Sequence, residues 1–193
     1  MNNVKMTSEQ LEKVGNTLVY IATNIPNIGK TRMLKLIFLI EETVIKRSQV
    51  PFLGLPYYVW QFGPVQREIY KDLVSKQHPL FNKYISITQD NDGKSSHIKA
   101  KVDFCNDEFS DFEIEIMNEI IRKYGNWSGK ELVEETHKEG TLWKNIVDKK
   151  NINFENKKHT NYIINFEKLL NKQERIKYRE SIEMEKFAAH FKK

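Results

Sequence analysis

One segment of the chain is apolar on nearly all sides of a helix, and no other feature constrains the fold as strongly. Between Thr31 and Lys46 the apolar positions surround the helix axis: Met33, Leu34, Leu36, Ile37, Phe38, Leu39, Ile40, Val44 and Ile45. A helix of this kind needs neighbours on every side. Its uninterrupted apolar run, Leu36 to Ile40, is far shorter than the roughly 20 residues that cross a bilayer. The segment therefore predicts a central helix inside a folded core and no membrane span.

Further helices are predicted from their start signals and periodicity. Three capping boxes, in which a Ser or Thr is followed three residues later by Glu or Gln, begin at Thr7, Ser110 and Ser128. Pro26 ends the first of these helices, and Gly125 stands where the second is expected to end. The predicted helices cover residues 8–25, 31–46, 64–75, 110–124, 128–137, 159–171 and 174–191.

Two stretches show the two-residue period of strands. The aromatic run 57–62 is expected to place Tyr58, Trp60 and Phe62 on one face and Tyr57, Val59 and Gln61 on the other. The run breaks at Gly63, and Pro64 suits the first turn of the following helix. Residues 84–104 alternate on both sides of Asn91-Asp92-Gly93, which predicts a hairpin. The predicted class is α+β, predominantly α-helical, with a helical core and a small antiparallel β-hairpin or sheet.

Length and charge indicate one domain with a C-terminal addition. A chain of 193 residues exceeds the usual core of roughly 100 to 150 residues, so we expect a domain over 1–150 and a helical extension over 151–193. The net charge of +5 is concentrated in this extension, which holds 10 Lys or Arg against 6 Asp or Glu. The interspersed acids disfavour a stripe that tracks phosphates. A nucleic-acid-binding or phage-regulatory module using Arg175, Lys177 and Arg179 is kept as the alternative, with salt-dependent binding as its test.

Motifs for catalysis or metal binding are incomplete. The sequence Gly29-Lys30-Thr31 resembles the end of a phosphate-binding loop, but Asn24 stands where that motif needs Gly, and a helix precedes it in place of a strand. Glu134 and His137 have the spacing of a carboxylate-histidine metal pair, yet no second copy exists. Cys105 is a single cysteine without a defined base. We therefore expect that the protein is not an enzyme and that it binds no metal and no cofactor. The single cysteine and the lack of an apolar leader sequence favour a cytoplasmic location.

Two sets of apolar residues are candidates for binding another protein. The aromatic face Tyr58, Trp60 and Phe62, with Arg67 beside it, would either pack on the core or anchor a partner. Its mixed charge surroundings disfavour stacking on single-stranded nucleic acid. The last predicted helix carries the second set, a stripe of Met184, Phe187, Ala188 and Phe191. This stripe suits a partner's groove and the chain's own core equally well.

Several segments together resemble a known family. They are Thr31–Leu39, the turn Trp60–Val65, Phe109-Ser110-Asp111 with Glu113, Leu132–His137 and Glu139–Lys144. In order and spacing, over about residues 8–150, they are similar to the Panacea domain, also called the SocA-like antitoxin domain.

The resemblance implies a bacterial or prophage antitoxin. Such a protein neutralises a toxin, usually encoded next to it, by direct complex formation without catalysis. Family members pair with toxins of unrelated folds, so the resemblance does not specify the toxin. In several family members, segments outside the shared domain vary with the partner, which would place part of the recognition in residues 151–193. The resemblance implies no cofactor and no catalytic residue.

Overall fold

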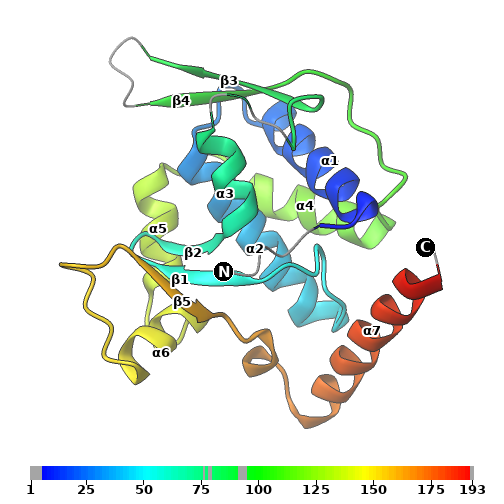
Figure 1. Ribbon diagram of the computed structural model, residues 1–193, viewed down its shortest axis with the longest axis vertical. Helices are drawn as coiled ribbons and strands as arrows, with labels where there is room; N and C mark the ends of the chain where they lie inside the picture. The colour runs from blue at the N-terminus through cyan, green and yellow to red at the C-terminus, as the bar shows by residue number, and fades with distance from the viewer. Residues whose placement is uncertain (1–5, 76, 78–79, 91–94, 192–193) are drawn as a thin grey trace.

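The computed structural model describes residues 6–75, 77, 80–90 and 95–191, the last three by their backbone alone. Within these residues seven α-helices alternate with short strands, and the helices dominate (Figure 1). The predicted helix-rich α+β class is confirmed. The elements are α1 (Ser8–Asn24), α2 (Lys30–Ser48), β1 (Tyr57–Trp60), β2 (Gly63–Gln66), α3 (Arg67–Val74), β3 (Ile85–Gln89), β4 (Ser96–Ala100), α4 (Asp111–Tyr124), α5 (Gly129–His137), α6 (Leu142–Lys149), β5 (His159–Ile163), the 3₁₀ helix η1 (Phe166–Leu169) and α7 (Lys172–Phe191).

Helix α2 is the centre of the molecule, as its all-round apolar pattern predicts. Figure 1 shows α2 surrounded by α1, α4, α5 and the three-stranded sheet. Met33, Leu36, Ile37, Ile40 and Ile45 on this helix are completely buried. Burial of such side chains is worth about 1.5–3 kcal/mol each, so this helix anchors the single large core.

The capping boxes and the hairpin are also confirmed. Thr7, Ser110 and Ser128 each cap a helix and receive the reciprocal bond from the side chain three residues on. Strands β3 and β4 pair antiparallel with Ile87 opposite Ile98. The predicted turn at Asn91-Asp92-Gly93 lies outside the described residues. None of the helices in the described part of the chain is long and apolar enough to cross a membrane.

The predicted helix start at Pro64 is wrong. Residues 57–66 form an antiparallel pair in which Trp60 lies opposite Gly63, and Pro64 belongs to β2. Gly63 has a φ of +97°, which a residue with a side chain rarely adopts, and it permits the sharp reversal after Gln61-Phe62. Proline is tolerated because β2 is an edge strand. Helix α3 begins later, where the Gln66 side chain accepts a bond from Ile69 N at 2.6 Å.

The predicted helix over 159–171 is wrong as well. Its first part is β5, which pairs antiparallel with β1 and gives the sheet order β2-β1-β5, and its second part is η1. Thr160 and Tyr162, like Ile163, favour strands, and β1 offers an unpaired edge to receive them. Helix α6, after its N-cap Thr141, is an additional helix. Helix α7 agrees with the prediction for 174–191.

Candidate partner-binding surfaces

The outer aromatic face of the β1–β2 hairpin is mostly covered. Tyr57 and Val59 belong to the main core, while Tyr58 and Trp60 form a small second cluster with Val65, so the predicted alternation is confirmed for residues 57–60. It does not extend to Gln61 and Phe62, which form the turn between the two strands. Tyr58 and Trp60 are each only 9% exposed. Their rings contribute chiefly to packing within the chain.

Side chains from two other elements provide the cover. The Arg67 guanidinium lies 3.8 Å from the Tyr58 ring centroid, and its Nη2 donates to Asn161 Oδ1 at 3.0 Å. The Trp60 ring meets Tyr70 at 4.9 Å and His159 at 4.0 Å between centroids. Arg67 thus covers the Tyr58 ring and connects α3 to β5 through its hydrogen bond to Asn161.

Phe62 differs from its two neighbours on this face. It lies at the β1–β2 turn and is 62% exposed. An exposed aromatic ring held by a tight turn loses little conformational freedom on binding, which suits a contact with another protein. Of the three predicted aromatic residues Tyr58, Trp60 and Phe62, only Phe62 is largely exposed.

A cavity of about 400 Å³ opens beside Phe62. It lies between the first turns of α2, the hairpin, α3 and the start of β5, and its basic side chains are Lys30, Lys35, Lys158 and His159. The sequence reasoning missed the site formed by these residues, because the strand 159–163 was interpreted as helix. The available signal was Lys35, a lone cation within the apolar pattern of residues 33–40.

Lys35 is an almost completely buried charged residue in the wall of this cavity. It is 1% exposed, and its Nζ donates to Pro64 O at 2.7 Å. Burial lowers the pKa of Lys35 to about 7. The pKa of His137 is likewise lowered, to about 4, first by burial and then by the charge of Lys35. The inner wall of the cavity therefore contains an ammonium group that can lose its proton near neutral pH.

The second candidate surface is the outer side of α7. Tyr178 is buried against the core and Ser181 Oγ donates to Gln49 O at 3.3 Å, so the first half of the helix is docked. Met184 and Phe187 are 72% and 68% exposed. The side chain of Phe191 lies outside the described residues. Figure 1 shows α7 at the lower right, far from the β1–β2 turn at the left, so the two candidate surfaces are separate.

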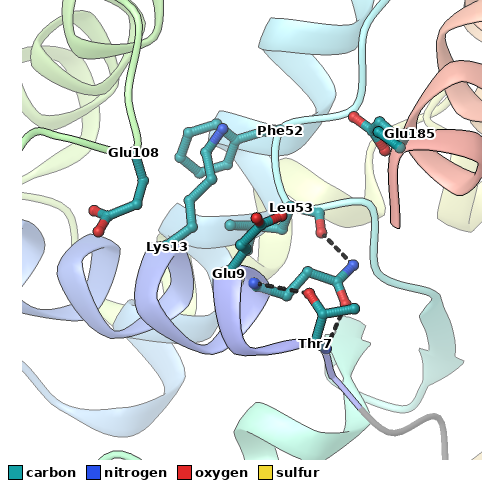
Figure 2. A pocket seen from close by; sticks show the side chains of 9 residues that line it. Thr7, Glu9, Lys13, Phe52, Leu53, Glu108 and Glu185 are labelled. Atoms are coloured by element: carbon teal, nitrogen blue, oxygen red, sulfur yellow. Dashed lines mark hydrogen bonds between the residues drawn. The ribbon is translucent and has the colours of Figure 1, made fainter. Parts of the chain in front are cut away.

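A hollow of about 450 Å³ lies between the second half of α7 and the start of α1 (Figure 2). Across it Glu185 of α7 faces the loop that carries Phe52 and Leu53. Lys13 extends over the Phe52 ring at 5.1 Å and pairs with Glu113 at 2.6 Å. Acidic groups in the lining, including Glu185, leave this hollow without a uniform charge.

The basic residues of α7 do not form an open phosphate-binding row. Arg179 pairs with Glu167 at 2.6 Å, and Arg175 Nε donates to the Glu167 carbonyl at 2.9 Å. Lys177 is exposed on the same helix. Two of the three cations that the nucleic-acid alternative uses are thus engaged with η1, and this geometry does not favour that alternative.

The predicted catalytic and metal candidates do not converge. Glu134 is exposed and lies 3.8 Å from Lys130, whereas the His137 ring stacks on Trp143 with centroids 3.6 Å apart. In the described part of the chain no group of three potential metal ligands occurs. Although a backbone bond at Asp107 lowers the pKa of the Cys105 thiol, the Asp107 side chain and burial raise it to a net value above the usual one. The neutral thiol is favoured, which makes Cys105 a poor nucleophile.

The described residues form a helix-dominated α+β scaffold that exposes apolar groups in two separate places. The family described as antitoxin SocA-like, Panacea domain, matches residues 33–144, and the chain belongs to this family. The match extends from α2 into α6, so β5 and α7 lie beyond it. No curated protein matches the chain, and no solved structure matches it.

Proposed function

We propose that this protein is the antitoxin of a bacterial or prophage toxin–antitoxin system, and that it neutralises a cognate protein toxin by forming a direct, non-catalytic complex in the cytoplasm. Membership in the SocA-like antitoxin family is the observation that carries the proposal. The family implies a toxin as partner in general terms. The exposed groups of the scaffold supply surfaces that fit such a partner.

The contact residues we assign come from both surfaces. Phe62 at the hairpin turn and Met184 and Phe187 on α7 provide large exposed apolar groups. Buried apolar anchors of this kind dominate the binding energy of protein complexes. Tyr58, Trp60 and Arg67 would support the hairpin that carries Phe62, and Phe191 belongs to the same apolar stripe in the sequence as Met184 and Phe187.

Co-expression tests the proposal. The product of the adjacent gene should stop growth when expressed alone, and this protein should restore growth and co-purify with it. Because complex formation consumes antitoxin, neutralisation should be complete only near equal molar amounts of the two chains. A catalytic antagonist would act at a small fraction of that amount, and a neighbouring product that is harmless alone would contradict the proposal.

Surface variants then separate the two candidate regions. Phe62→Ser and the pair Met184→Ser/Phe187→Ser should each weaken toxin binding by about ten-fold or more if their region contacts the toxin, since loss of a buried anchor costs about 2 kcal/mol or more. Val102→Ser is the matched control, because Val102 is also an exposed apolar residue, at 46%, and belongs to neither region. Equal affinity in all variants and the control would exclude both surfaces.

A further inference from the structure

The cavity beside Phe62 is lined by basic residues without acidic ones, which distinguishes it from four other hollows of the described structure. Lys30, Lys35 and Lys158 line it together with His159, and no Asp or Glu contributes to its wall. Four other hollows in the described part of the chain each include at least one carboxylate. The salt bridges found among the described residues involve none of these three lysines. Lys30 and Lys158 therefore bring positive charge to the cavity that forms no salt bridge within the described part of the chain.

The N-terminus of α2 adds to the positive electrostatic potential of the cavity. Gly29 caps the helix without a side-chain bond, and no acidic residue lies in the first turn. The first backbone N–H groups of a helix have no acceptor within it, and its N-terminus carries a partial positive charge. Lys30 and Thr31 of this turn belong to the cavity wall. A negatively charged group is thus favoured by both the side chains and the helix end.

Two buried polar atoms of the lining residues have no hydrogen-bond partner among the described residues. They are Nε1 of Trp60, a donor, and Oε1 of Gln61, an acceptor. Trp60 is more than nine-tenths buried, and its ring is held between Tyr70 and His159. A buried donor without a partner costs about 1–3 kcal/mol. A ligand that accepts a bond from the Trp60 indole would recover that cost.

We infer that this cavity receives an acidic side chain of the partner protein, whose apolar neighbour packs on Phe62; this inference rests on the proposed antitoxin function. The carboxylate would lie near the ammonium groups of Lys30 and Lys158. The apolar part of the wall, from Leu34, Val65 and Tyr70, suits the stem of the inserted residue. A volume of about 400 Å³ has room for a side chain of this size.

Protein is favoured over nucleic acid as the source of the negative charge. The lysines gather around one cavity, whereas a nucleic-acid backbone needs a continuous basic track. Glu68, next to Arg67 on α3, interrupts any such track, and it pairs with Lys71 at 3.2 Å. An acidic residue flanked by an apolar one matches both the basic cavity and the exposed ring at its edge.

The first experiment uses peptides and does not need the toxin. The indole N–H signals of the three tryptophans are followed by NMR in the full chain while acetyl-Glu-Phe-Glu-amide is added at millimolar concentration. We expect the Trp60 signal to shift and that of Trp127 to stay in place. Trp143 does not serve as a reference, because its Nε1 donates to Trp60 O at 2.8 Å. The peptide acetyl-Gln-Phe-Gln-amide should leave Trp60 unchanged. A Trp60 signal that responds to inorganic phosphate or oligothymidylate but not to the acidic peptide would overturn the inference.

The second experiment uses the co-purified toxin. Lys30→Gln/Lys158→Gln removes two charges at the cavity, and Lys172→Gln/Lys177→Gln removes two from exposed lysines of α7 as a control of equal net charge. The cavity variant should bind the toxin about ten-fold or more weakly than the control, because hydrogen bonds to charged groups contribute about 1.5–3 kcal/mol. Circular dichroism confirms that both variants are folded.

The outcomes distinguish the inference from the function on which it rests. Toxin binding that is equally strong in the cavity variant and the control, with an unresponsive Trp60, would refute the acidic contact and leave the antitoxin function intact. A Trp60 signal that responds to the acidic peptide in a protein that binds no toxin would support the cavity and refute the function.

Discussion

Replacing Gly63 by Ala tests whether the hairpin and the buried lysine are fitted to one another. Gly63 has a φ of +97°, and a Cβ built there would lie 2.6 Å from Thr136 Oγ1 and 3.0 Å from Lys35 Nζ. The first distance is far below normal van der Waals contact. Gly63→Ala must therefore strain the backbone and also displace Thr136 or Lys35.

The expected loss has two parts. A residue with a side chain at positive φ costs about 1–2 kcal/mol. Forcing extra volume into a packed site costs about 1–3 kcal/mol more. Both neighbours are buried and held, since Thr136 Oγ1 donates to Val133 O at 2.9 Å and Lys35 Nζ donates to Pro64 O at 2.7 Å. We expect Gly63→Ala to lower the free energy of unfolding by about 2–5 kcal/mol in total.

Gly140→Ala is the matched control. Gly140 has a φ of +84°, and a Cβ there would meet no atom within 4 Å. This variant should lose only the backbone part, about 1–2 kcal/mol. Urea unfolding followed by far-ultraviolet circular dichroism measures both values, and the m-values should agree with that of the parent chain. Equal losses for the two variants would refute the proposed fit between Gly63, Thr136 and Lys35.

Two further predictions concern a helix cap and the buried lysine. Ser128→Ala removes the side-chain oxygen that accepts from Glu131 N, so it should lower the free energy of unfolding by about 1 kcal/mol. Ser128→Asp keeps an acceptor at this position and should retain most of the parent stability. Urea unfolding measures both variants. The pKa of Lys35 is about 7 in the folded chain against 10.5 in the unfolded one, so the unfolded state binds more protons between these values and stability should rise with pH there. Lys35→Met lacks this titrating group. Relative to that variant, the free energy of unfolding of the parent chain should rise by up to about 1.4 kcal/mol per pH unit above pH 7. Parallel plots of unfolding free energy against pH for the two chains would contradict the lowered pKa of Lys35.

Local signals in the sequence predicted the helical framework well. The capping boxes at Thr7, Ser110 and Ser128 and the all-round apolar pattern of α2 depend on residues within a few positions of one another. Such signals are independent of the rest of the chain. This is why the central helix, its neighbours and the β3–β4 hairpin were predicted correctly.

Features that depend on distant partners were not predictable in the same way. The segment 159–163 is a strand because β1 offers it an edge about 100 residues earlier in the chain. Pro64 enters β2 because Gly63 reverses the chain and Lys35 supplies a donor to its carbonyl. Tyr58 and Trp60 are covered by Arg67, Tyr70 and His159, which only the folded arrangement reveals. The basic cavity depends on the same long-range pairing.

The position of β5 affects how the C-terminal part of the chain can change during evolution. This strand lies beyond the family match, yet it forms one edge of the sheet whose other two strands lie inside the match. Insertions or exchanges within residues 159–163 would disturb the register against Tyr58 and Trp60, whereas exchanges after Leu170 would leave the sheet intact. A functional chimera between two members of the family should therefore keep the strand with the shared domain and exchange only the terminal helix.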